Sequence, residues 1–72
     1  MKDFQIREYG RTELAMIYNQ DISQRSAWRR LRTWMEKSPG LMQRLYDTGY
    51  DDSQRIFTPI QVRIIVDHLG EP

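Results

Sequence analysis

The chain contains no cysteine, so it can form neither disulfides nor thiolate metal sites. It also lacks a long hydrophobic run, because its most apolar stretch, PIQVRIIVDHL at 59–69, is too short and too charged to span a bilayer. The first ten residues carry charges throughout, unlike a signal peptide, whose centre is apolar. We therefore expect a cytoplasmic protein with no membrane partner.

Residues that commonly catalyse reactions or bind metals are scarce. His68 is the only histidine, and no carboxylate lies at a familiar ligand spacing from it. The sequence has no Gly-rich phosphate loop, no nucleophile elbow and no H-E-x-x-H motif. Asp47-Thr48-Gly49 matches the loop of aspartic proteases, but the residues before it have helical spacing, and we interpret 45–52 as a solvated turn. We predict no enzymatic activity, cofactor, metal or small-molecule substrate.

The chain is long enough for one domain with a small core, so we expect a single domain over residues 1–72. Apolar residues recur at helical spacing in four segments, each preceded by a residue that can cap a helix. The predicted helices, counted from their candidate N-caps, cover 12–18 (Thr12), 23–37 (Ser23 or Ser26), 38–48 (Ser38) and 58–69 (Thr58).

The clearest local signal is TPIQ, in which Thr58 is followed by Pro59 and, three residues on, by Gln61. This is the pattern of a capping box with proline at the first helical position. Residues 4–6 alternate apolar and polar side chains, and 56–57 are both apolar. These two segments predict a short two-stranded β element.

Positive charge is concentrated in one segment. Residues 23–37 contain five of the eleven Lys and Arg residues and one acidic residue, Glu36, whereas both flanking segments are slightly acidic. At about 100° per residue, Ala27, Leu31 and nearby apolar residues gather on one side of this helix. We expect the basic residues to lie on the other side, facing solvent or a partner.

A helix with such a basic outer face, preceded by a shorter helix and a polar turn, is the pattern of a helix-turn-helix. The second helix fits the DNA major groove, where arginines can contact phosphates or guanine edges. On this interpretation ELAMIY (13–18) belongs to the supporting helix, NQD (19–21) is the turn, and Ile22 fills the core beside it. The residues predicted to bind nucleic acid are Gln24, Arg25, Arg29, Arg30 and Arg32.

Two resemblances add to this interpretation. The segment ELA…IS..SA.RRL resembles the winged helix-turn-helix modules of MerR-type regulators and excisionases, and RIFTPIQVRII (55–65) resembles the stretch that closes their wing. With the predicted elements, this implies a mainly α fold: a small winged helix-turn-helix-like domain with four helices and a short two-stranded β element. The chain is also similar to a family of short bacterial proteins known as a domain of unknown function, through FQIREYG.TELA..Y, SA.RRL..W, GY and R.FTP.QV..I...LG.P.

Other interpretations of the same features stay open. The basic residues could form a solvated face or dock an acidic protein partner. Ile60 and Ile64 widen the apolar side of the last helix, which could form a homodimer or partner interface. Trp34, and Trp28 at the margin of the apolar face, are expected in the core. The hypothesis that we favour is an accessory or regulatory protein that binds double-stranded DNA.

Overall fold

The computed structural model describes residues 4–72, which contain four helices and two short antiparallel strands. This confirms the predicted fold class, a small and mainly α domain with a two-stranded β element. None of the described helices has the length and apolarity needed to cross a bilayer. The elements in chain order are β1 (Tyr9–Gly10), α1 (Arg11–Tyr18), α2 (Gln24–Lys37), α3 (Leu41–Asp47), β2 (Ile56–Phe57) and α4 (Pro59–Leu69).

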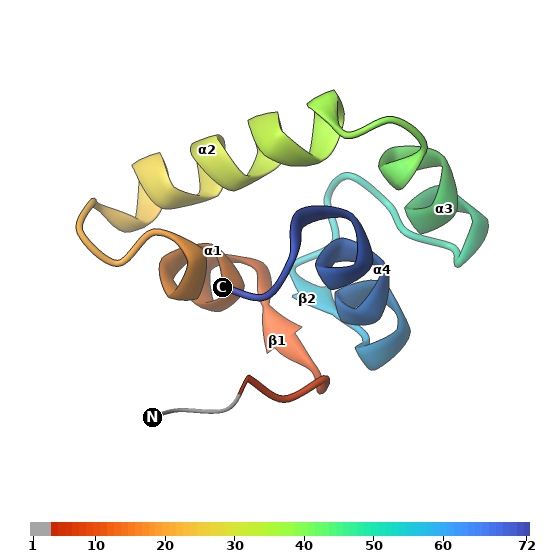
Figure 1. Ribbon diagram of the computed structural model, residues 1–72, viewed down its shortest axis with the longest axis horizontal. Helices are drawn as coiled ribbons and strands as arrows, with labels where there is room; N and C mark the ends of the chain where they lie inside the picture. Colours follow the sequence, from red (N-terminus) through yellow and green to blue (C-terminus); the bar gives the residue numbers. More distant parts are fainter. Residues whose placement is uncertain (1–3) are drawn as a thin grey trace.

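The longest helix, α2, lies along one side of the molecule, and the other elements pack beneath it or at its end (Figure 1). α1 supports its N-terminal half, and α3 meets its C-terminal end. In this view α1 is seen nearly end-on while α2 lies in the plane, so the two helices cross steeply, as they do in a helix-turn-helix. One long side of α2 is left uncovered by other elements.

The two strands bring distant parts of the chain together. β1 and β2 are antiparallel, with Tyr9 opposite Phe57 and Gly10 opposite Ile56. The expected N-terminal strand at 4–6 is wrong, because Tyr9 is the residue of this segment that is buried and paired with Phe57. The second expected strand is confirmed by β2.

The two helices with the strongest capping signals begin as predicted. Ser23 caps α2, where its Oγ accepts a hydrogen bond from the backbone of Ser26 at 3.2 Å. At the start of α4, Thr58 Oγ1 accepts from the backbone of Gln61 at 3.3 Å, and Gln61 Oε1 accepts from the backbone of Thr58 at 3.0 Å. This reciprocal pair is the predicted capping box, with Pro59 in the first turn.

The other two helices begin at different residues from those predicted. The N-cap of α1 is Gly10 rather than Thr12, and Glu13 Oε1 accepts from the backbone of Gly10 at 3.1 Å. Because Gly10 also belongs to β1, the helix starts directly where the strand ends. The predicted start of α3 at Ser38 is wrong, because the helix follows Gly40, whose φ of 83° costs a glycine little.

A small core fills the space between the helices and the sheet. Trp28 is half-buried, with its ring centroid 6.2 Å from that of Phe57. Trp34 is 38% exposed, so its expected place in the core is wrong. It lies at the edge of the apolar side of α2, where it contacts only the ring of Tyr18, edge to face, among the described aromatic rings. The largest fully buried side chains are Leu14, Leu31, Met35, Leu41, Leu45, Phe57, Val62 and Ile65.

Candidate nucleic-acid interface

Helical geometry places most basic residues of α2 away from the core. Ala27, Leu31 and Met35 are buried along one side of the helix. The opposite side is exposed, and its residues follow one another at intervals of one, three or four positions. We call this set the outer stripe: Ser26, Arg29, Arg30, Thr33 and Lys37.

Three arginines in the N-terminal half of α2 have no ion-pair partner among residues 4–72. They are Arg25, Arg29 and Arg30, and all three are exposed. The one acidic residue of α2, Glu36, is bound to Arg32 instead. The positive charge of the three arginines is therefore not neutralised within the described part of the protein, and it is available to an anionic partner.

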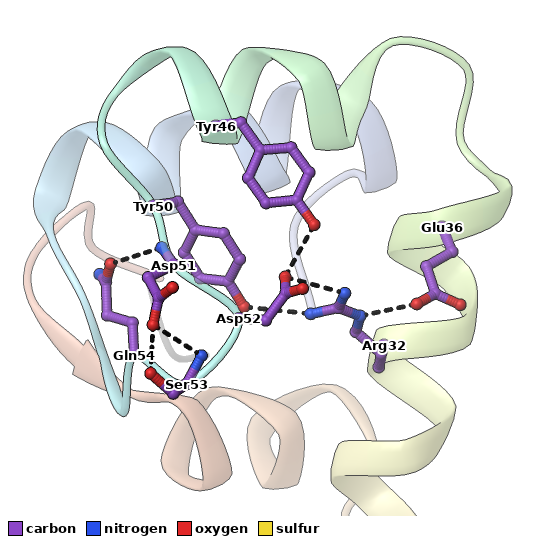
Figure 2. Close-up of polar contacts among 8 residues, drawn as sticks. All are labelled: Arg32, Glu36, Tyr46, Tyr50, Asp51, Asp52, Ser53 and Gln54. Carbon is purple, nitrogen blue, oxygen red and sulfur yellow. Dashed lines mark hydrogen bonds and ion pairs between the residues drawn. The ribbon is translucent and has the colours of Figure 1, made fainter.

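Arg32 lies on a flank of α2, where three groups of the protein bind its guanidinium (Figure 2). Its Nε donates to Glu36 Oε2 at 2.8 Å, its Nη2 to Asp52 Oδ1 at 3.1 Å and its Nη1 to the Tyr50 hydroxyl at 3.3 Å. The side chain is 22% exposed. The expectation that Arg32 projects freely from the helix is therefore wrong, because folding brings Asp52 into contact with it.

Tyr46 completes this cluster, because its hydroxyl donates to Asp52 Oδ1 at 2.7 Å. The hydrogen bonds from Tyr46 and from Arg32 lower the pKa of Asp52. The hydrogen bond between Tyr46 and Asp52 also raises the pKa of Tyr46. Burial acts to lower the pKa of Arg32, but the hydrogen bonds to Glu36 and Asp52 outweigh it and raise that pKa. We call the cluster of Arg32, Glu36, Tyr46, Tyr50 and Asp52 the arginine clamp.

The loop that carries Asp52 has hydrogen bonds of its own. Asp51 Oδ2 accepts from both the backbone and the hydroxyl of Ser53 (Figure 2). The carboxylates are exposed, as expected of a turn, but Tyr50 is buried and Asp52 is bound to α2. Interpreting 45–52 as a solvated turn is wrong for 45–47, which end α3 and include the fully buried Leu45, and it misses this contact. An aromatic residue within an acidic turn, Tyr50, is the one local signal that could have indicated it.

Gln24, the first residue of α2, does not belong to the outer stripe. It is exposed, but it precedes buried Ala27 by three residues and therefore starts the side of the helix that turns toward the core. Gln24 is therefore exposed, as expected, but it does not lie beside Arg29 and Arg30 on the outer stripe. Of the predicted binding residues, Gln24, Arg25, Arg29 and Arg30 are exposed on α2, and Arg29 and Arg30 lie together on the outer stripe.

His68 lies between α4 and the connection from α2 to α3. Its Nε2 is 3.2 Å from Arg44 Nη1, and its Nδ1 is 3.2 Å from Ser38 Oγ. A guanidinium only donates hydrogen bonds, so Nε2 is the acceptor and the ring proton lies on Nδ1, pointing at Ser38. In this arrangement His68 cannot take a proton from Ser38. Within residues 4–72, no three His, Cys, Asp or Glu side chains are grouped as metal ligands.

The chain belongs to a family described as a domain of unknown function (DUF4248), whose model matches residues 5–72. The match includes all the helices and strands described above. It confirms the similarity to a family of unknown function that the sequence indicates. No curated protein and no solved structure matches the chain.

Proposed function

We propose that this protein binds double-stranded DNA through the exposed arginines of α2, as an accessory or regulatory protein. The observation that carries the proposal is that Arg25, Arg29 and Arg30 are exposed and have no carboxylate partner among residues 4–72. Unpaired arginines grouped on one helix attract polyanions, and the DNA major groove admits a helix.

The arrangement of α1 and α2 supports this choice of partner. The two helices cross steeply, and one long side of α2 is uncovered (Figure 1). A helix-turn-helix places its second helix in the groove while its first helix crosses the backbone. On this proposal, the resemblance of residues 13–31 to MerR-type regulators and excisionases reflects the same presentation of the second helix in a bacterial regulatory protein.

In this proposal Arg32 stabilises the fold and does not contact DNA. Its guanidinium is bound to Asp52 and Tyr50, which lie in the loop before β2, and to Glu36 one turn further along α2. The arginine clamp therefore connects α2 to the rest of the domain and helps to set the orientation in which the free arginines are presented. Gln24 is not among the proposed contacts, because it is uncharged and starts the side of α2 that turns toward the core.

The proposal includes no chemical reaction and no cofactor. The Ser38–His68 pair has its ring proton on the wrong nitrogen for a nucleophile and base.

A protein that binds DNA in a bacterial cell acts in the cytoplasm, and we propose that location.

Binding of a labelled duplex, followed by fluorescence anisotropy, tests the proposed function. Arg29→Ala should weaken binding by about three- to tenfold, because one phosphate contact is lost. Arg63→Ala removes the same charge from an exposed position on α4 and should change the affinity by less than about twofold. Equal affinities for the wild type and both variants would overturn the proposal and favour an adaptor that binds an acidic protein.

A second candidate function, contact with a protein partner or a second copy, is favoured by two exposed isoleucines. Ile56 is 49% exposed and Ile60 is 66% exposed, whereas Ile64, expected to widen the apolar side of α4, is buried. The apolar surface that α4 offers is therefore narrower than predicted. If the protein forms a dimer there, Ile60→Asp should convert it to a monomer in sedimentation velocity. A wild-type protein that sediments as a monomer contradicts self-association.

A further inference from the structure

We infer that the outer stripe of α2 binds a backbone phosphate of DNA, in a hollow between Ser26, Arg29 and Arg30, so that the protein binds duplexes with little regard to their sequence. The inference rests on the proposed function and adds the chemical group that α2 recognises. It also assigns a role to Ser26, which the sequence marked only as a possible helix cap.

The outer stripe is hollowed over its first two turns. A surface depression of about 360 Å³ is lined by Ser26, Arg29, Arg30 and Thr33. Arg29, Arg30 and Thr33 lie three, four and seven positions after Ser26, so helical geometry turns all four to the same side. Both arginines are exposed and lack a carboxylate partner among residues 4–72. The depression is therefore electropositive.

The hydrogen-bonding groups around the hollow match a phosphate. Thr33 Oγ1 donates to the backbone oxygen of Arg29 at 3.0 Å, so its hydroxyl proton is already used. Ser26 takes part in the helix cap through its backbone nitrogen, which leaves its hydroxyl able to donate outward. Two guanidinium groups and one hydroxyl thus present donors to a single hollow. An anion with several acceptor oxygens, such as a phosphate, satisfies all of them.

The same stripe is poorly equipped to distinguish bases. Its arginines could read guanine, but adenine is read by Asn or Gln and cytosine by acidic side chains, and the outer stripe contains none of these. The amide of Gln24 begins the side of α2 that turns toward the core, and the carboxylate of Glu36 is bound to Arg32. Arg29 and Arg30 line the same hollow, where one phosphate can contact both, and this favours a phosphate over successive base edges.

The experiment compares two duplexes of unrelated sequence at several salt concentrations. Arg30→Ala should weaken binding to both by the same factor, about five- to tenfold, and make the slope of log K against log salt shallower by about 0.9. Ser26→Ala should cause a smaller loss, about two- to threefold, again equal on both duplexes. Arg63→Ala should leave both affinities within about twofold of the wild type.

The outcomes separate the inference from the proposed function. A loss confined to one duplex would indicate base reading and overturn the inference while the proposed function stands. Binding to neither duplex would overturn the proposed function.

Inorganic phosphate added to the free protein is the second arm, with sodium chloride at equal ionic strength as its control. Phosphate-specific NMR shifts of the Arg29 and Arg30 side chains support the site, even if no duplex binds. If phosphate causes no such shift and the variants lose affinity equally for both duplexes, the site binds the DNA phosphodiester alone. No such shift with unequal losses overturns the inference.

Discussion

At the scale of single residues, Arg29 and Arg32 lie one turn apart on α2, but their guanidinium groups have different surroundings. Arg29 is exposed and lacks a carboxylate partner among residues 4–72, whereas Arg32 is bound to Glu36 and Asp52. The same type of side chain therefore serves two purposes on one helix. Arg32 contributes to the stability of the fold, and Arg29 leaves its charge available to a partner.

Arg32→Ala should reduce the free energy of unfolding by about 1 kcal/mol, because the charged hydrogen bonds of Arg32 are lost. The loss is no larger because the carboxylates of Glu36 and Asp52 are exposed, so that water screens their interaction with Arg32. Arg25→Ala removes an exposed arginine from the same helix and should change it by less than about 0.5 kcal/mol. Urea unfolding midpoints measure both values. Equal midpoints for the two variants would contradict a stabilising role for Arg32.

Asp52 links stability to pH. The hydrogen bonds from Tyr46 and Arg32 favour its carboxylate and hold its folded-state pKa below the ordinary value of 3.8. The resulting stabilisation is fully present above the unfolded-state pKa and is lost as the pH falls through the folded-state pKa. Urea midpoints measured from about pH 2 to 7 should therefore fall on the acid side in the wild type and fall less in Asp52→Asn. The urea midpoints of the wild type and Asp52→Asn should differ most at neutral pH. Parallel pH profiles for the two proteins would contradict the account.

At the scale of helices, local sequence decides some boundaries and not others. The caps at Ser23 and Thr58 need only residues within three positions, and both are where the sequence predicts them. The start of α1 depends on Gly10, which pairs with β2 from the far end of the chain, so the local candidate Thr12 was wrong. Sequence analysis therefore predicted the elements and the local caps, but not the boundaries that the sheet determines.

Thr58→Ala should lower the free energy of unfolding by about 1 kcal/mol, because the side-chain half of the α4 capping box is lost. Thr12→Ala is the matched control, since Thr12 lies inside α1 and caps nothing there, and it should cost less than about 0.5 kcal/mol. Thermal or urea unfolding followed by circular dichroism measures both. A larger loss for Thr12→Ala than for Thr58→Ala would contradict the assigned caps.

At the scale of the whole molecule, the candidate site depends on contacts between distant segments. Helical spacing predicted the basic side of α2, but it could not separate free arginines from bound ones, because two of the three partners of Arg32, Tyr50 and Asp52, lie 18 and 20 positions away. It also could not place Trp34, which is 38% exposed and packs edge to face on Tyr18, the last residue of α1. The clamp and the free arginines are consequences of tertiary structure.

The sheet that joins the two ends of the domain should contribute more to the stability of the fold than its short length suggests. Phe57 is buried opposite Tyr9, so Phe57→Leu should cost about 1–2 kcal/mol and lower the melting temperature by roughly 5–15 °C. Ile56→Ala, at the exposed neighbouring position, should lower it by less than about 5 °C. A similar loss for both variants would contradict the central place of Phe57 in the core.

The salt dependence of duplex binding tests the central claim most directly. If Arg25, Arg29 and Arg30 each make one ionic contact with the DNA backbone, log K should fall against log salt with a slope of about −2.7, a roughly 40-fold loss of affinity between about 50 and 200 mM salt. An affinity that does not change with salt, or no binding at the lowest salt, would contradict the claim that α2 binds DNA.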